Sequence, residues 1–411
     1  MQTFGIYPAD IYLPAPHLNQ KKWAVVACDQ FTSDPEYWQK VEQEAGEAPS
    51  ALRIVYPEIY LSEGEKRIPF IRESMEKYVA EGALTVQVEN GFVLCERTTE
   101  SGKRIGLVAA VDLEDYDFTP GTSAPIRATE GTILSRIPPR VKIREGALME
   151  SPHVMLLMDD PDDTVLGKLY AEKENLKKVY DTELMMGGGT LKGWAVTEDT
   201  QKNALYAALK DLNKACKGFL FAVGDGNHSL ATAKACWENK KATLSQEEQK
   251  TDAARFALVE IVNLHSPALQ FEPIHRMVFR ADGHQMMLDF AAYLRERGMA
   301  SMPGKDIVFL CNGQETGLSV KNAGNMLPVA VLQPFLDRYL QENKNCEIDY
   351  IHEADAVEKM SRDKGTGILL TAIEKDSLFP GIVSGGVLPR KTFSMGHGHE
   401  KRYYMECRKI K

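Results

Sequence analysis

The apolar positions in the first quarter of the chain predict two helices followed by a sheet rich in hairpins. Apolar residues recur at helical spacing over 35–45 and 65–81. Ser33 or Asp34 would cap the first of these helices, with Pro35 in its first turn. A buried strand over 23–28 precedes them, and three half-buried strands with hairpin turns at Asn90-Gly91 and Ser101-Gly102 follow, over 84–89, 91–97 and 104–111.

The middle of the chain combines buried strands with amphipathic helices. A long polar segment over 114–147, rich in hydroxyls, glycine and arginine, predicts a long loop that is either functional or disordered. Its basic residues near the end are Arg136, Arg140, Lys142 and Arg144. The pattern then predicts strands over 153–158 and 218–223, helices over 199–215 and 229–240, and a helix over 246–263 that could straighten into a strand at 257–262.

From residue 306 onward, short strands and helices alternate, with helices expected over 328–342 and 353–363. The sequence therefore predicts an α+β protein. A main domain over 1–300 would be a mixed sheet flanked by helices. A smaller α/β module would occupy 301–411.

The strongest candidate for a functional segment is the run Gly218-Phe219-Leu220-Phe221-Ala222-Val223-Gly224-Asp225-Gly226-Asn227-His228-Ser229. An apolar strand, a glycine turn and a helix start would gather backbone N–H groups and a helix dipole at one point, which suits phosphate. Asp and Asn are also common capping and turn residues, so a plain strand-to-helix turn is the alternative. His228 is neither, and it favours a functional loop.

Composition narrows the class of protein. No apolar run approaches the ~20 residues of a membrane span, and Met1–Asp10 lacks the pattern of a signal peptide, so we expect a cytoplasmic protein without a membrane partner. The net charge of −9 argues against a nucleic-acid partner. The seven cysteines are scattered without a Cys-x-x-Cys pair, which favours free thiols over disulfides or structural zinc.

Three motifs in order resemble the bacterial domain-of-unknown-function family 1015. That family carries Asp-Gly-His-His-Arg after a strand, then Pro-Thr-His-Arg, then Met-Pro-x-Lys-Ser. The corresponding segments here are Asp225-Gly226-Asn227-His228-Ser229, Pro273-Ile274-His275-Arg276 and Leu388-Pro389-Arg390-Lys391-Thr392. The resemblance covers most of the chain.

The first motif is also similar to one in the ParB/sulfiredoxin superfamily, which includes nucleotide-binding segregation proteins and free-serine kinases. The resemblance implies a ParB/sulfiredoxin-like core with Gly224, Gly226, Asn227 and Ser229 beside a nucleotide phosphate. Ser229 stands where the family has Arg, so a guanidinium that would grip phosphate is missing. Either another arginine substitutes for it, or phosphate handling is altered.

The resemblance also implies roles for the other motif residues. Asp225 would place Mg²⁺ or orient the phosphate, and His228 would contact phosphate. His275 and Arg276 would bind an anion, and Lys391 would offset transition-state charge. We expect the loops over 119–145, 273–276 and 389–400 to converge on the glycine loop.

A general base for a substrate hydroxyl is expected among the carboxylates near the basic segment. Glu145 is the first candidate, and Glu130, near Arg127, competes with it; a solvated charge cluster is the alternative for both. His397 and His399, with Glu400, have metal-ligand spacing, but the surrounding glycines favour a loop near the site.

These residues and motifs predict two alternative functions. The first is a phosphotransferase that uses ATP or ADP with Mg²⁺ and acts on a small hydroxyl-bearing metabolite such as free serine. The second is a regulatory protein that binds a nucleotide without turnover, which the altered Asn227 and Ser229 favour. The sequence leaves the nucleotide, the substrate and the oligomeric state open.

Overall fold

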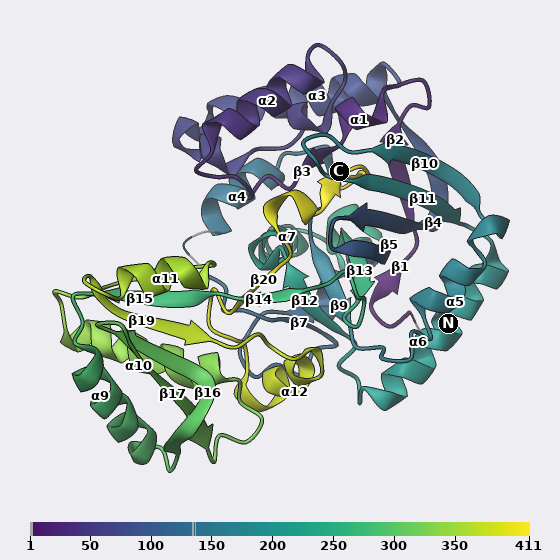
Figure 1. Cartoon of the computed structure of the whole chain (residues 1–411). Helices are drawn as coiled ribbons and strands as arrows, with labels where there is room; N and C mark the ends of the chain where they lie inside the picture. The colour runs from purple at the N-terminus through teal and green to yellow at the C-terminus, as the bar shows by residue number, and fades with distance from the viewer. Residues whose placement is uncertain (1–2, 134, 136) are drawn as a thin grey trace. The chain divides into compact units, whose positions relative to one another are not determined.

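The chain divides into two compact units in the computed structural model, which describes residues 3–133, 135 and 137–411 (Figure 1). Unit 1 comprises the residues up to Ala128, Thr132–Gln270 and Gly396–Lys411, and unit 2 comprises Thr129–Gly131 and Phe271–Met395. These bounds differ from the predicted domain boundary at residue 300, and strand pairing explains the difference. Strand β15 (His275–Phe279) joins the unit 2 sheet, and the C-terminal segment pairs with strands of unit 1.

The centre of unit 1 is an 11-stranded mixed sheet. Most neighbouring strands are antiparallel, whereas β13 with β9, β12 with β7, and β6 with β7 are parallel. The main path runs β10 (Lys177–Glu183), β11 (Thr190–Val196), β4 (Leu84–Thr99), β5 (Gly102–Asp112), β13 (Phe256–Asn263), β9 (Met155–Met158), β12 (Phe221–Asp225), β7 (Ile126–Ala128) and β6 (Tyr116–Asp117). Strand β1 (Ile6–Tyr7) pairs with β5, and β2 (Ala9–Pro14) pairs with β4.

Both faces of this sheet are buried, because successive residues of a strand point to opposite faces. In β4, Val93 and Cys95 belong to one core, and Phe92 and Leu94 belong to the other. Helices supply the second layer of each core. Those of unit 1 are α1 (Gln20–Trp23), α2 (Pro35–Ala45), α3 (Ile68–Ala80), α4 (Ile137–Arg144), α5 (Leu166–Ala171), α6 (Asp199–Ala215), α7 (Asn227–Lys241) and α8 (Gln246–Thr251).

The predicted hairpin turn at Asn90-Gly91 is wrong. Strand β4 continues through these residues, and its first half pairs with β2 while its second half pairs with β5 and β11. Asn90 has φ +42°, and the β2–β4 register shifts nearby, so the Asn-Gly pair forms an irregularity within one long strand. The turn at Ser101-Gly102, which joins β4 to β5, is confirmed.

Two other segments differ in part from the pattern prediction. The predicted loop over 114–147 contains β6, β7 and helix α4, although Arg136 lies outside the described residues. The segment over 246–263, predicted as a helix that could straighten into a strand at 257–262, is short helix α8 followed by strand β13, so the strand at 257–262 is confirmed. The residues of β13 are almost all buried. Buried strands lack a polar face, so their apolar runs do not distinguish them from helices.

The C-terminal segment of unit 1 returns to the first part of the chain. Strand β21 (Tyr403–Tyr404) pairs with β3 (Val25–Val26), and β22 (Arg408–Lys409) pairs with β8 (Met149–Glu150). Figure 1 shows the C-terminus close to β3. These pairings surround the segment that leads into β9, and they position several side chains of the site described below.

Unit 2 is a five-stranded antiparallel sheet with helices. Its order is β17 (Gln314–Lys321), β16 (Ala300–Cys311), β19 (Gly365–Leu370), β15 and β18 (Glu347–Ile351). A separate pair joins β14 (Phe271–Pro273) to β20 (Phe393–Met395). The helices are α9 (Gly283–Glu296), α10 (Pro328–Glu342), α11 (Ala354–Met360) and α12 (Lys375–Gly385).

The predicted fold class, a mixed sheet flanked by helices with a smaller α/β module, is confirmed. Several helices also match their predicted bounds closely. The ends of α2, α6 and α10 agree with the sequence pattern, and Asp34 caps α2 by accepting a hydrogen bond from Tyr37 N at 3.0 Å. Among the described residues, no helix combines the length and the apolar character that a membrane crossing requires.

Candidate active site

The glycine loop has the predicted strand–turn–helix form. Strand β12 ends at Asp225, Gly226 follows, and helix α7 begins at Asn227. Gly226 has φ +79° and ψ +26°, a left-handed conformation that glycine adopts without steric cost. Gly226 has no side chain, so it cannot cap the backbone N–H groups in the first turn of α7.

Close packing gives a second reason for glycine at this position. A Cβ on Gly226 would lie 3.0 Å from the Cα atom of Val154, which precedes β9. The loop therefore lies directly against the segment that carries His153. This approach brings the first turn of α7 next to that histidine.

Asp225 is held by its own loop and by the C-terminal segment. Its Oδ1 accepts a hydrogen bond from Gly226 N at 2.8 Å, and its Oδ2 lies 3.2 Å from Lys401 Nζ. A carboxylate with these two partners is fixed in orientation. Lys401 adds a cation beside the loop that the sequence motifs did not indicate.

Three side chains of the first turn of α7 take different directions. His228 Nε2 accepts a hydrogen bond from Ile133 N at 3.2 Å, and Asn227 Nδ2 lies 3.5 Å from Val223 O. Ser229 Oγ lies 3.0 Å from His153 Nε2. Ser229 therefore connects the first turn of α7 to His153, as Asp225 connects the loop to Lys401.

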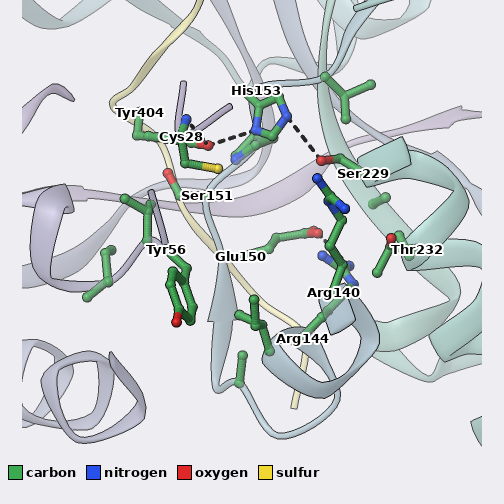
Figure 2. A pocket seen from close by; sticks show the side chains of 18 of the residues that line it. Cys28, Tyr56, Arg140, Arg144, Glu150, Ser151, His153, Ser229, Thr232 and Tyr404 are labelled. Carbon is green, nitrogen blue, oxygen red and sulfur yellow. Dashed lines mark hydrogen bonds and ion pairs between the residues drawn. The ribbon is translucent and has the colours of Figure 1, made fainter. Parts of the chain in front are cut away.

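His153 is the centre of a polar cluster that no sequence motif predicted (Figure 2). Its Nδ1 lies 2.7 Å from the hydroxyl of Tyr404, and that hydroxyl accepts a hydrogen bond from Cys28 N at 3.0 Å. On the other side of the ring, Nε2 faces Ser229 and lies 3.8 Å from Asp29 Oδ2. Four segments of unit 1 meet at this imidazole.

The surroundings of His153 favour its charged form. Burial by itself lowers the pKa of the imidazole, but the charge of Asp29 and a hydrogen bond with Cys28 outweigh burial and raise it to about 10. Burial likewise works to raise the pKa of Asp29, but the charge of His153 and a hydrogen bond from Gln30 bring it below its ordinary value. The pair is therefore an imidazolium and a carboxylate at neutral pH.

A cavity of about 180 Å³ opens beside this cluster. Figure 2 shows Ser229 and Thr232, both from α7, on one side of it, and Cys28, Ser151 and Tyr404 near His153. Apolar side chains form much of the remaining wall: Ile54, Val55, Leu61, Met75, Ile143, Met149, Val154, Leu230 and Leu258. A concave, mostly apolar site with a few converging polar groups is typical of ligand pockets.

Helix α4 contributes two arginines to the cavity. Arg140 and Arg144 are four residues apart, so they lie on the same face of the helix. Arg140 forms an ion pair with Glu58, and Arg144 Nη2 lies 2.6 Å from Glu150 Oε2. The predicted basic loop is therefore in part a helix that directs two guanidinium groups to the site.

The Glu150 carboxylate is buried and ionised. Burial works to raise its pKa, but the charges of Arg144 and Arg408 lower it below the ordinary value. Its Oε1 also accepts a hydrogen bond from Leu258 N at 2.9 Å. By contrast, Glu145, the predicted general base, is exposed just after α4 and is not among the residues that line the cavity.

The residues of the second motif lie within unit 2. His275 Nδ1 accepts a hydrogen bond from Leu370 N at 3.2 Å, and burial together with Arg276 lowers the pKa of this imidazole. Arg276 is fully buried, donates to Gln333 Oε1 and Ile274 O, and lies against the ring of Tyr350. Burial lowers the pKa of its guanidinium to about 10.

The remaining predicted residues of unit 2 lie near its C-terminal strands. Lys391 is exposed in a left-handed turn, and Glu130 Oε1 accepts a hydrogen bond from Thr392 N at 3.3 Å. The structure thus groups Gly224, Asp225, Gly226, Asn227, His228 and Ser229 in unit 1, and Glu130, His275, Arg276 and Lys391 in unit 2. The expected convergence of the three motif loops stays a prediction.

The His397–Glu400 segment has a structural role. Glu400 is buried and accepts hydrogen bonds from Ser101 N and His397 N, both at 3.1 Å. Burial opposes ionisation, but these and other hydrogen bonds lower the pKa of Glu400 to about 2. Within residues 3–133, 135 and 137–411, no group of three or more His, Cys, Asp or Glu side chains is arranged to hold a metal ion.

Sequence reasoning missed Cys28, His153 and Tyr404 at the polar end of the cavity, and Lys401 beside the glycine loop. His153 is the first residue of a predicted buried strand, where a polar residue is unusual. This position was the one signal in the sequence that could have identified His153 as a site residue. Asp29 had a signal as well, because it follows an early strand. The others are brought to the site by strand pairing between the two ends of unit 1.

No curated protein matches this chain. Among solved structures, a free serine kinase in complex with AMP is 10% identical, with a TM-score of 0.40, over 74% of this chain and 92% of that one. A conserved hypothetical protein from Pyrococcus furiosus is 9% identical, with a TM-score of 0.35, over 70% of this chain and 90% of that one. SbnI from Staphylococcus aureus, with a C-terminal truncation, is 9% identical, with a TM-score of 0.35, over 70% and 82%. These scores are too low to support an argument about function.

The family comparison also covers most of the chain, and it identifies a family. The model of the family described as "Protein of unknown function (DUF1015)" matches residues 11–339. That range includes the glycine loop, helix α4, His153 and the His275-Arg276 motif. The chain therefore belongs to the DUF1015 family.

Proposed function

We propose that this protein is a nucleotide-dependent phosphotransferase that acts on a small hydroxyl-bearing metabolite. The observation that carries the proposal is the glycine loop at the start of α7, where Asp225 pairs with Lys401 and Ser229 contacts His153 beside the cavity. Backbone N–H groups at a helix start, beside cations, attract phosphate. The similarity of the Asp225–Ser229 motif to the ParB/sulfiredoxin superfamily supports a nucleotide as its source.

In this proposal the donor is ATP or ADP, and its phosphate lies at the glycine loop. The bond from the terminal phosphorus to its bridging oxygen breaks, and a bond to the acceptor hydroxyl oxygen forms. The hydroxyl proton passes to a carboxylate, with Glu145 or Glu130 as the candidates that the sequence supplies. Asp225 orients the loop, and His228 and Lys401 lie beside the transferred charge.

Mg²⁺ is part of the same proposal. Asp225 offers a single carboxylate, which suits an ion that takes most of its ligands from nucleotide phosphates and water. When bound, the ion would neutralise phosphate charge. The first experiment is therefore a thermal-shift series with ATP, ADP, CTP and GTP, each with and without Mg²⁺.

The variant that tests the site is Asp225→Asn. Asp252→Asn is a matched control, because Asp252 also accepts a backbone hydrogen bond, from Ala254 N, and pairs with a lysine, Lys240, which lies in the last turn of α7, at the opposite end from the glycine loop. We expect Asp225→Asn to abolish the nucleotide-induced rise in melting temperature and Asp252→Asn to keep it. Equal shifts in both variants would refute the assignment of the glycine loop.

A phosphorylated product separates catalysis from binding. Phosphorus NMR on mixtures of nucleotide and hydroxyl-bearing amino acids, free serine included, should show a new phosphate ester that Asp225→Asn removes. Glu145→Gln and Glu130→Gln then identify the base, since only the base variant should lose turnover while nucleotide binding persists. If neither variant loses turnover, both base assignments are wrong.

A regulatory protein that binds a nucleotide without turnover is the second candidate. Two carboxylates, Glu58 and Glu150, belong to the described lining of the cavity, and both are paired with arginines. Paired carboxylates are poor proton acceptors, which favours binding over transfer. A nucleotide-specific thermal shift without any product would establish this candidate.

A further inference from the structure

The cavity beside His153 has two chemically different parts. One end holds hydroxyl and thiol groups with the imidazole: Cys28, Ser151, His153, Ser229 and Tyr404. The rest of the lining is mostly aliphatic, with the thioethers of Met75 and Met149, and it also holds the ring of Tyr56, the hydroxyl of Thr232 and two arginine–glutamate pairs, Arg140–Glu58 and Arg144–Glu150. A fully polar molecule would leave the aliphatic wall without a partner, so the wall favours a ligand with an apolar body.

The volume limits the size of that body. The cavity measures about 180 Å³, and an apolar cavity of roughly 150 Å³ in an engineered protein binds benzene. A branched aliphatic chain or a single aromatic ring therefore fits the apolar part.

The charges favour a ligand with one negative charge. Among the described residues that line the cavity, Arg140, Arg144 and His153 are cationic, and Glu58 and Glu150 are anionic. One positive charge is therefore in excess at the lining.

The charged groups paired with lining residues leave this excess unchanged. Asp29 faces His153 at 3.8 Å, and Arg408 faces Glu150 at 2.7 Å, so one charge of each sign is added. The Asp225–Lys401 pair beside the glycine loop is balanced in the same way. Burial of a single ligand anion would offset the excess.

The hydrogen bonds at the polar end provide a donor for that anion. An imidazolium donates from both ring nitrogens, so His153 directs one N–H toward Tyr404 and the other toward Ser229. Ser229 Oγ then acts as an acceptor, and its own O–H is left to donate. A carboxylate or hydroxyl oxygen in the cavity is the partner that this hydrogen suits.

We propose that the cavity binds a small hydroxy acid with a branched aliphatic or single-ring body, its carboxylate and hydroxyl at the Ser229 end and its apolar body against Ile54, Val55 and Met149. The proposal rests on the proposed function, since this hydroxy acid would be the acceptor of the phosphoryl group. It departs from free serine, whose side chain offers nothing to the aliphatic wall.

Binding is measured on the full chain without nucleotide, by calorimetric titration with three probes. They are 2-hydroxyisocaproate, its uncharged amide, and L-serine. We expect 2-hydroxyisocaproate to bind about tenfold or more tightly than either of the others, which corresponds to ~1.4 kcal/mol. Equal affinity for serine, or for the amide, would overturn the apolar or the anionic part of the proposal.

Two variants locate the binding. Ser229→Ala removes the hydroxyl and should weaken 2-hydroxyisocaproate about tenfold. Ala233→Met fills the cavity from α7, whereas Ala235→Met, on the same helix but outside the lining, is its control. Loss of binding in Ala233→Met with retention in Ala235→Met supports the site, and retention in both excludes it. If Ala233→Met does not fold, Ser229→Ala by itself tests whether the ligand binds in this cavity.

The two proposals can fail separately. If 2-hydroxyisocaproate binds but no nucleotide shift and no phosphate ester are found, the cavity assignment stands and the phosphotransferase is refuted. If serine is phosphorylated while 2-hydroxyisocaproate neither binds nor reacts, the phosphotransferase stands and the hydroxy-acid assignment is refuted.

Discussion

The imidazole of His153 and the carboxylate of Asp29 form an ion pair at the end of the cavity, with Nε2 and Oδ2 3.8 Å apart. Asp29 directly follows Cys28, whose backbone N–H is bound by Tyr404. The pair therefore connects the first part of the chain, the segment before β9 and the C-terminal segment. Its charge state controls both the stability of this junction and the polarity of the cavity.

The first prediction concerns pH. The folded pKa of His153 is raised to about 10, so its contribution to stability is complete below the ordinary value of 6.5 and is lost as pH rises through 10. The free energy of unfolding of the wild type should therefore exceed that of His153→Asn at pH 6, and the difference should shrink steadily up to pH 10.5. Urea unfolding across this range measures it. A difference that does not change with pH would show that His153 is neutral in the folded protein.

The second prediction concerns the glycine loop. Gly226→Ala places a Cβ 3.0 Å from Val154 Cα at φ +79°, whereas Gly218→Ala has the same backbone problem, at φ +88°, in open space. Gly218→Ala tests the backbone conformation alone, because nothing lies near its Cβ. We expect it to lower the unfolding free energy by about 1–2 kcal/mol. Gly226→Ala should cost more, because the loop must also move away from Val154. Equal losses in urea unfolding would mean that the contact with Val154 contributes nothing.

The third prediction concerns a buried ion-pair network in unit 1. Arg402 Nε lies 2.9 Å from Glu260, and Arg402 Nη2 lies 2.7 Å from Glu406, with all three side chains buried. Arg402→Met leaves two buried carboxylates without their shared cation and should cost about 3–5 kcal/mol of unfolding free energy.

A surface arginine provides the control for this variant. Arg338 also bridges two carboxylates, Glu296 at 2.8 Å and Glu342 at 2.9 Å, but all three are exposed. Water and salt screen such pairs, so Arg338→Met should change stability far less. Comparable losses in chemical unfolding of the two variants would show that Glu260 and Glu406 carry no burial penalty when Arg402 is removed.

The fourth prediction concerns the start of α2. Asp34 Oδ1 accepts a hydrogen bond from Tyr37 N at 3.0 Å. Asp34→Ala should cost about 1 kcal/mol, and Asp34→Ser should restore most of it, since serine is an equally good cap. Guanidinium unfolding of the three proteins provides the measurement. Failure of serine to restore stability would indicate that the charge of Asp34, and not its capping bond, is what matters.

The sequence by itself determined the elements whose signals are local. A cap and helical spacing set the bounds of α2, and helical spacing set those of α10. Gly226 between an apolar strand and a helix defined the glycine loop. Each of these signals depends on residues within a few positions of one another. The sequence could not distinguish strand β13 from a helix, since a strand buried on both faces has no polar period.

Tertiary structure alone decided which residues share a site. Asp29, His153, Ser229 and Tyr404 are far apart in the chain, and they meet because β21 pairs with β3 and because Gly226 allows α7 to approach Val154. No local pattern encodes such contacts. The raised pKa of His153 likewise depends on partners, above all Asp29, that only the folded chain brings next to it. The charge of the cavity could therefore not be predicted from the sequence.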